Sequence, residues 1–138
     1  MKTCKYLLSP ILTLCVLLFF QPAIAESQGL LDGTSYVGQN GEKGREANQN
    51  DTLYFNEGLF ISESCSDYDF KHGKYDAWED AGKIHFKATT ISPTHGQLSW
   101  KGSLDGTVMN VTYIWTKKRW YWADIHREYW FNGTLKAE

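Results

Sequence analysis

Long hydrophobic runs are scarce in this chain, and the one that stands out covers residues 6–20. It is interrupted by a Ser-Pro pair and falls short of the roughly 20 apolar residues that a membrane-spanning helix needs. Two lysines precede the run, and a short segment ending in the small residue Ala25 follows it, which is the layout of a cleaved secretory signal. We therefore predict a signal peptide over residues 1–25 and an exported domain, periplasmic or secreted, over residues 26–138. No stable membrane anchor is expected after cleavage.

Cysteine is also rare. Of the three cysteines, Cys4 and Cys15 lie in the predicted signal peptide, so the mature chain keeps Cys65 alone. An internal disulfide is thereby excluded, although an exported protein could form one, and stability must come from a packed core. We expect Cys65 to be a buried, unreactive thiol. Pairing with another chain, catalysis and metal binding are the alternatives.

The mature chain has no strong charge of either sign. Loss of two lysines with the signal leaves 12 Lys and Arg residues against 16 Asp and Glu, an excess of four negative charges. This balance predicts no general attraction to nucleic acid or to an anionic membrane. The four histidines, at positions 72, 85, 95 and 126, lack metal-ligand spacing and are expected on the surface or in loops. No arrangement of nucleophile, base and orienting group can be recognised in the linear order. The sequence thus predicts no metal, no cofactor and no catalytic residue, and it favours a protein that is not an enzyme.

A helical period is missing from every stretch of ten or more residues, whereas alternation of apolar and polar residues recurs throughout the mature chain. Clusters of Gly, Pro, Asn and Asp separate the alternating segments. The pattern predicts an all-β domain with eight strands, near residues 34–39, 52–56, 59–64, 75–79, 84–90, 97–104, 107–115 and 128–136. Short connections make these strands neighbours in a single antiparallel up-and-down meander. Closure into a barrel would remove the exposed edges of such a sheet.

One predicted hairpin has a definite register. Asp105-Gly106 is a favoured two-residue turn that would pair Leu104 with Thr107 and, further along, Leu98 with Tyr113. Both strands then place their apolar residues on the same face, and a slip by one residue would turn one of these sets toward water.

A second hairpin, at residues 56–58, leaves two registers open. A three-residue loop would put Leu59 and Ile61 on the face of Phe55, whereas a two-residue loop would pair Phe55 with Phe60.

The spaced glycines and aromatics in two segments resemble those of a known architecture. Trp100-x-Gly102-x-Leu104-x-Gly106, followed by Tyr129-x-Phe131-x-Gly133-x-Leu135, resembles the closing hairpins of small lipocalin-like (calycin-type) barrels of exported bacterial proteins. The resemblance implies a barrel with a cavity for a small molecule.

Aromatic residues are the obvious candidates for a binding site. The predicted inward-facing set is Trp100, Tyr113, Trp115 and Tyr129, which could line a ligand cavity with stacking surfaces and polar tips. The competing interpretation, which we favour slightly, is that these side chains fill the barrel.

The segment 117–122 places three cations next to three aromatics. Trp120 and Trp122 could therefore stack on a ligand. We favour the structural alternative, in which the aromatics cap one mouth of the barrel while the cations stay in water.

Together these patterns favour a non-enzymatic, exported barrel that binds a small apolar or aromatic molecule, either inside or at the mouth near Trp120 and Trp122. The alternative is a protein-binding module, such as an inhibitor of a hydrolase or an envelope adaptor. Its contacts would come from the loops around residues 65–75 and 117–127.

Overall fold

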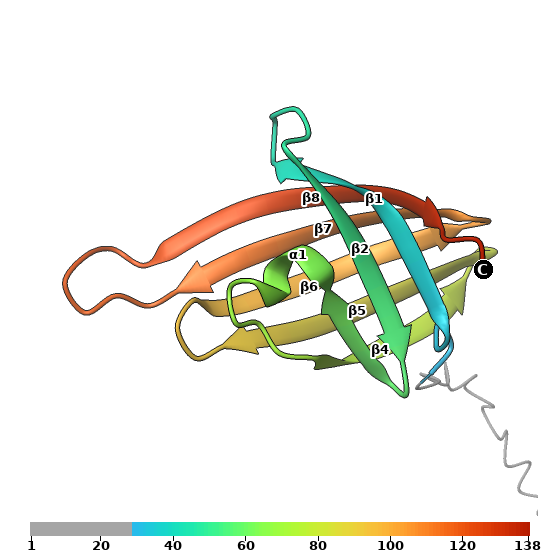
Figure 1. Ribbon diagram of the computed structural model, residues 1–138, viewed down its shortest axis with the longest axis horizontal. Helices are drawn as coiled ribbons and strands as arrows, with labels where there is room; N and C mark the ends of the chain where they lie inside the picture. Colours follow the sequence, from blue (N-terminus) through green and yellow to red (C-terminus); the bar gives the residue numbers. More distant parts are fainter. Residues whose placement is uncertain (1–28) are drawn as a thin grey trace, which may run out of the picture.

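The computed structural model describes residues 29–138 as an antiparallel β-barrel (Figure 1). The strands are β1 (Thr34–Glu42), β2 (Gln49–Asn56), β3 (Leu59–Ser62), β4 (Gly73–Asp80), β5 (Lys83–Ser92), β6 (Gly96–Asp105), β7 (Val108–Lys117) and β8 (Ile125–Leu135). Each strand pairs with the next along the chain, and β1 pairs with β8. The predicted all-β fold, its eight strands in up-and-down order and the closed barrel are therefore confirmed. The predicted signal peptide lies outside the described residues.

A short helix, α1 (Glu63–Ser66), follows β3 directly. The predicted third strand, residues 59–64, thus ends two residues early. Ser62 is the N-cap of α1, because its hydroxyl oxygen accepts a hydrogen bond from the backbone amide of Cys65 at 3.3 Å, and Glu63 adds a negative charge to the first turn. None of the helices within residues 29–138 has the length and hydropathy needed to cross a bilayer.

The register of the hairpin between β6 and β7 differs from the predicted register by two residues. Its turn is Gly106-Thr107, and the strands pair Asp105 with Val108 and Trp100 with Tyr113. The predicted turn required a positive φ at Asp105, but in the structure the positive φ (61°) is at Gly106, as in a type II′ turn with glycine first. A shift of two residues keeps every side chain on its predicted face, so the assignment of the buried side is unaffected.

The hairpin between β2 and β3 adopts the two-residue alternative. Phe55 pairs with Phe60 across a Glu57-Gly58 turn in which both residues have a positive φ, as a type I′ turn requires. Both phenylalanines are buried, whereas Leu59 is only half-buried.

The two ends of the barrel have different connections. Two-residue turns join β2 to β3, β4 to β5 and β6 to β7 at one end, which we call the closed end. The connections at the other, open end are longer and cover residues 43–48, 63–72, 93–95 and 118–124. Figure 1 shows these longer segments gathered away from the C-terminus.

The segment before β1 plugs the closed end. Leu31 is buried, and its backbone amide donates to the hydroxyl oxygen of Tyr75 at 3.1 Å. That hydroxyl donates in turn to Asp32 Oδ1 at 2.6 Å, and the backbone amide of Gly58 donates to the same carboxylate oxygen. These bonds satisfy the polar groups of the plug, so an apolar side chain can close the barrel without leaving buried donors unpaired.

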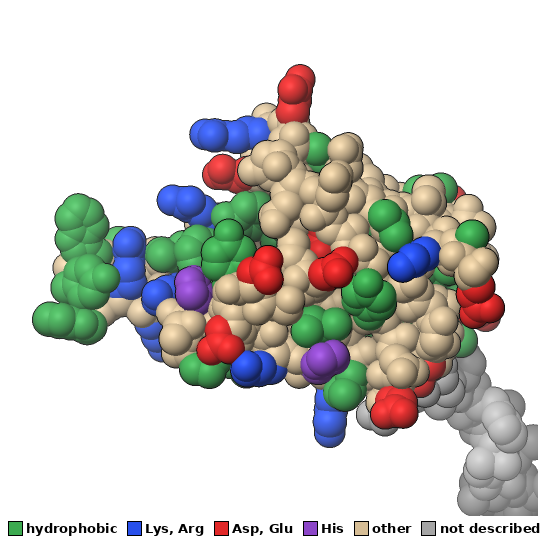
Figure 2. All heavy atoms as spheres, viewed as in Figure 1, with side chains coloured by type: hydrophobic (Ala, Val, Ile, Leu, Met, Phe, Trp, Pro, Cys, Tyr) green, Lys and Arg blue, Asp and Glu red, His purple; other side chains and the backbone are tan. Residues whose placement is uncertain are grey.

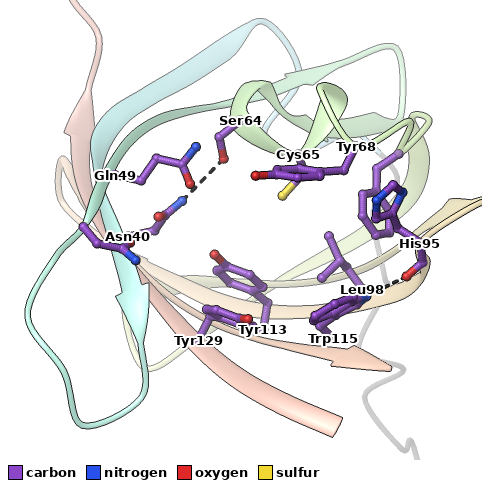
Figure 3. A pocket seen from close by; sticks show the side chains of 12 residues that line it. Asn40, Gln49, Ser64, Cys65, Tyr68, His95, Leu98, Tyr113, Trp115 and Tyr129 are labelled. Atoms are coloured by element: carbon purple, nitrogen blue, oxygen red, sulfur yellow. Dashed lines mark hydrogen bonds between the residues drawn. The ribbon is translucent and has the colours of Figure 1, made fainter. Parts of the chain in front are cut away.

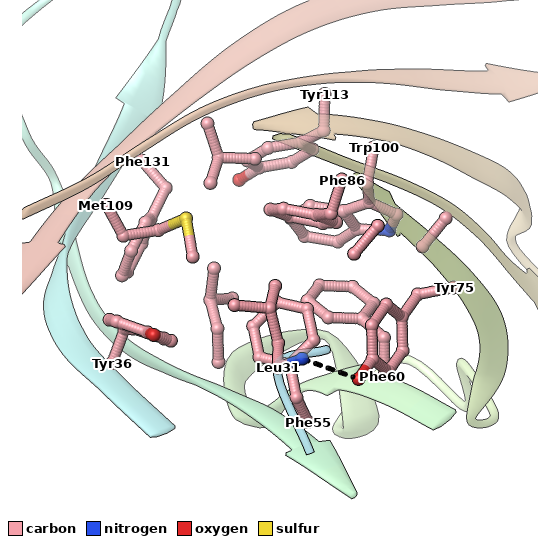
Figure 4. Packing of buried hydrophobic residues seen from close by; sticks show 14 of the residues in the cluster. Leu31, Tyr36, Phe55, Phe60, Tyr75, Phe86, Trp100, Met109, Tyr113 and Phe131 are labelled. Atoms are coloured by element: carbon pink, nitrogen blue, oxygen red, sulfur yellow. Dashed lines mark hydrogen bonds between the residues drawn. The ribbon is translucent and has the colours of Figure 1, made fainter. Parts of the chain in front are cut away.

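Aromatic packing makes the closed half of the barrel solid (Figure 4). Phe55 is at its centre, with ring centroids 4.9 to 6.0 Å from four other rings: Tyr36, Phe60, Tyr75 and Phe86. Most of these contacts are edge-to-face, which is a favoured geometry for aromatic pairs. These rings leave no cavity around Phe55.

The barrel wall is weakest between β3 and β4, which share just two register pairs, at Leu59 and Phe60. Helix α1 directly follows β3 and packs against β2 and β3, and the buried carboxylate of Asp51 on β2 holds it there. Asp51 Oδ1 accepts from the backbone amides of Ser64 (2.9 Å) and Thr52 (2.8 Å). Asp51 Oδ2 accepts from Ser62 Oγ (2.6 Å) and Asn40 Nδ2 (3.3 Å). One carboxylate thus joins β1, β2 and α1.

Replacement of Asp51 by Ala is expected to lower the free energy of unfolding by about 3 kcal/mol, because several buried donors lose their acceptor. Asp51→Asn keeps the shape but turns an NH₂ group toward donors, so it should be nearly as destabilising. Urea unfolding of both variants tests this, with Asp105→Ala as the control, since Asp105 is exposed. A loss below about 1 kcal/mol for Asp51→Ala would contradict the assigned role.

Candidate functional site

A cavity of about 260 Å³ occupies the open half of the barrel (Figure 3). We call it the open-end pocket. It lies between α1 with the adjoining parts of β1 and β2 on one side and β6, β7 and β8 on the other. Its lining residues are Asn40, Asn48, Gln49, Ser64, Cys65, Tyr68, Phe70, His95, Leu98, Tyr113, Trp115 and Tyr129. The side chains therefore come from distant parts of the chain.

One wall of the pocket is a row of stacked aromatic rings. Trp100, Tyr113 and Tyr129 stand directly opposite one another on β6, β7 and β8. The Trp100 and Tyr113 ring centroids are 4.2 Å apart at an interplanar angle of 25°, and those of Tyr113 and Tyr129 are 5.1 Å apart at 12°. The corrected register creates this row, because in the predicted register Tyr113 would have faced Leu98. Stacking across neighbouring strands holds the rings of this wall in place.

Trp115 extends the aromatic wall toward the mouth and is fixed in place. Its indole N–H donates to the backbone carbonyl oxygen of His95 at 2.6 Å. The His95 ring makes an edge contact with Tyr68 at 5.5 Å, and its Nδ1 is 2.8 Å from Thr94 Oγ1. The 93–95 connection thus positions three rings around the rim.

The opposite wall is polar. It presents the amides of Asn40, Asn48 and Gln49 and the hydroxyl of Ser64. Asn40 Nδ2 is 3.5 Å from Ser64 Oγ and also donates to Asp51. These partners fix the orientation of the Asn40 amide, which leaves its carbonyl oxygen available to a ligand.

None of the pocket's lining residues is Asp, Glu, Lys or Arg. The nearby carboxylate of Asp51 lies within the wall and already accepts four hydrogen bonds. Burial raises the pKa of Tyr113, with smaller contributions from Cys65, Asp51 and Tyr129, so the phenol stays protonated at neutral pH. Its hydroxyl points into the cavity (Figure 3) and has no hydrogen-bond partner among residues 29–138. The lining therefore holds no carboxylate, ammonium or guanidinium group, and it offers a free hydroxyl.

The predicted site residues fall into three groups. Tyr113, Trp115 and Tyr129 line the pocket, whereas Trp100 is buried beneath Tyr113 and donates its indole N–H to Thr90 Oγ1. Trp120 and Trp122 lie in the 118–124 connection at the same end of the barrel, but they are 95% and 69% exposed and do not line the pocket. The prediction that these aromatics cap the mouth is wrong, because the loop carries them outward into solvent.

The polar wall was missed by sequence analysis. Asn40, Gln49 and Ser64 have no motif in common, and only the pairing of β1 with β2 and the position of α1 bring them together. The spacing from Ser62 to Cys65 was a usable signal for α1, because serine is a favoured N-cap. His95 was expected in a loop and does lie in one, yet it also lines the pocket.

Cys65 is half-buried at the edge of the pocket, and its thiol pKa is raised to about 11. Loss of solvation is the main cause, and the negative charge of Asp51 acts in the same direction, against hydrogen bonds from Ser62 and Ser64. A thiol with so high a pKa is a poor nucleophile at neutral pH. Within residues 29–138, His, Cys, Asp and Glu side chains form no group of three or more that could hold a metal ion.

Comparisons of this chain with known protein families, with curated proteins and with solved structures give no match. The class that the structure itself defines is a closed antiparallel eight-stranded barrel, compatible with a lipocalin-like fold.

The raised pKa of Cys65 predicts slow alkylation. At pH 8 the folded protein should react with iodoacetamide about 100-fold more slowly than the urea-unfolded protein, because the thiolate fraction falls tenfold for each unit of pKa. The rate should keep rising up to about pH 11. A rate that levels off below pH 9 would contradict the assignment.

The same shift makes stability depend on pH. The thiol of the unfolded chain, with a pKa near 9.0, loses its proton at a lower pH than the thiol of the folded protein. The stability that depends on a protonated Cys65 is therefore complete below pH 9 and is lost as the pH rises toward 11. Thermal melts of the wild type and Cys65→Ser at pH 8 and pH 10.5 check the sign. The wild type should lose more stability than the variant between these two values.

Proposed function

We propose that this protein is an exported, non-enzymatic barrel that binds a small uncharged molecule with an apolar or aromatic ring in the open-end pocket. The observation that carries the proposal is the pairing of two unlike walls around one cavity: stacked rings on β7 and β8, and amide and hydroxyl groups on β1, β2 and α1. Apolar walls with a few fixed polar groups are typical of small-molecule sites.

The size of the cavity limits the ligand. At about 260 Å³ it falls below the roughly 300–1,000 Å³ of sites for drug-sized molecules. It suits a molecule of roughly one or two rings rather than a long lipid or a macrocycle. The solid aromatic packing around Phe55 limits its depth.

The absence of Asp, Glu, Lys and Arg from the lining favours a neutral ligand. An ionised group in this cavity would lose its hydration without an Asp, Glu, Lys or Arg partner in the lining, which is costly in a partly apolar environment. The Tyr113 hydroxyl and the amides of Asn40 and Gln49 can instead exchange hydrogen bonds with a carbonyl, hydroxyl or amide on the ligand.

The groups in the pocket support binding rather than chemistry. The Cys65 thiol has a raised pKa, and the Asp51 carboxylate is occupied by hydrogen bonds inside the wall. Neither is prepared to act as a nucleophile or a general base at neutral pH.

Calorimetric titration with neutral one-ring and two-ring aromatic compounds tests the proposal, with the carboxylate or amine analogue of each compound as the charged comparison. We expect saturable binding of some neutral members and weaker binding of their charged analogues. Trp115→Ala and Tyr129→Ala should each weaken binding about tenfold or more, because a ring contact is lost. Trp78→Ala is the matched control, since Trp78 stacks on His85 and does not line the pocket.

A second measurement reports on the pocket itself. A bound molecule should slow alkylation of Cys65 at pH 9.5, because Cys65 is part of the lining. No saturable binding of any compound class, or binding that leaves Cys65 alkylation and the Trp115→Ala variant unaffected, would reject the open-end pocket as the binding site.

A further inference from the structure

The 118–124 connection between β7 and β8 projects beyond the barrel and ends in exposed aromatic rings. Figure 2 shows a group of hydrophobic side chains standing out at this end of the molecule, with basic side chains next to it. The exposed fractions are 95% for Trp120, 63% for Tyr121 and 69% for Trp122. We call these three residues the aromatic tip. Such large rings are usually at least partly covered in soluble proteins, so their shared exposure indicates an interaction surface.

The loop that carries the aromatic tip has a defined structure. The guanidinium of Arg119 donates from Nε and Nη2 to the carbonyl oxygen of Ala123, at 2.9 and 2.7 Å. The backbone amide of Arg119 donates to Asp124 Oδ1 at 3.2 Å. These bonds close the base of the loop and hold the rings outward, where Trp120 and Tyr121 pack edge to face at 5.2 Å.

Basic residues lie next to the aromatic tip, on its barrel side. Lys117, Lys118 and Arg119 immediately precede it, and the acidic residue that follows, Asp124, already accepts the amide of Arg119. Trp and Tyr are enriched at the boundary between lipid and water, where an amphipathic ring can keep its polar atom in the headgroup layer. Lysine and arginine next to such rings are attracted to anionic lipid headgroups. The rings are outermost, so they would reach deepest into the bilayer surface. The cations behind them would stay at the level of the anionic headgroups.

We propose that the aromatic tip is a reversible membrane-docking element that inserts its rings into the headgroup region of an anionic bilayer. The shape favours lipid over a folded protein partner, because the rings form a narrow projection (Figure 2) at the end of the β7–β8 hairpin (Figure 1). The expected excess of acidic residues in the mature chain predicts no general attraction to such a surface, so docking is local and sets the orientation of the barrel. The open-end pocket lies at the same end of the barrel and would face the bilayer.

Vesicle binding tests this proposal, with the protein purified after export. Vesicles of phosphatidylcholine with about one third phosphatidylglycerol provide the anionic surface, and pure phosphatidylcholine vesicles provide the neutral one. We expect co-sedimentation with the anionic vesicles, a blue shift of tryptophan emission and quenching by brominated lipid. Binding should weaken about tenfold or more between low and high salt, because the cations are screened.

Matched variants locate the contact. Trp120→Ala with Trp122→Ala should reduce partitioning into anionic vesicles about tenfold or more, since two interfacial rings are lost. Lys117→Gln with Lys118→Gln should remove most of the preference for anionic lipid. The controls are Trp78→Ala, a half-buried ring on β4, and Lys83→Gln with Lys101→Gln, two cations outside the loop.

Two results would overturn the proposal. One is a wild-type protein that does not bind vesicles of either composition. The proposal also falls if, in that case, the tip binds a purified protein instead. The other is vesicle binding that the double tryptophan variant retains in full. The test is independent of the open-end pocket, because the double tryptophan variant leaves every pocket residue unchanged and should keep its ligand affinity.

Discussion

The buried carboxylate of Asp51 is the interaction on which the open half of the barrel depends. Strand pairing between β3 and β4 stops after two register pairs, and the four-residue helix α1 that follows β3 is too short to be stable alone. Asp51 belongs to β2, and it accepts hydrogen bonds from Ser62 and Ser64 at the start of that helix. The same attachment positions Ser64 and Cys65 in the pocket wall. The attachment of α1 to β2 and the formation of this wall of the pocket therefore depend on the same carboxylate.

The row formed by Trp100, Tyr113 and Tyr129 separates a solid half of the barrel from a hollow one. On one side, rings around Phe55 fill the interior down to the plug at Leu31. On the other, Tyr113 and Tyr129 line the cavity, and their rings are already held in place because each packs on its neighbour. A ligand would meet a preformed surface, so little conformational entropy would be lost on binding.

Alternation of apolar residues was enough to predict the fold, because an error of two residues in the β6–β7 register leaves every side chain on its correct face. The residue pairs that face each other across neighbouring strands depend on the exact register, and alternation alone does not predict them. Trp100 meets Tyr113 only because glycine occupies the first position of the turn, at Gly106. Helix α1 was missed since its stability comes from Asp51, a residue that precedes it by more than ten positions. For the same reason the sequence offered the rings of the aromatic wall as candidates, beside the favoured interpretation that they fill the barrel, and it offered no residue of the polar wall.

Amide hydrogen exchange in the native protein tests the role of Asp51 most directly. The backbone amides of Ser64 and Thr52 both donate to its carboxylate, one from α1 and the other from β2. The account predicts that both exchange as slowly as the paired amides of β6 and β7, because they open only when the wall of the barrel opens. Exchange of the Ser64 amide at the rate of an exposed amide in the 43–48 connection would show that α1 is not held by this carboxylate.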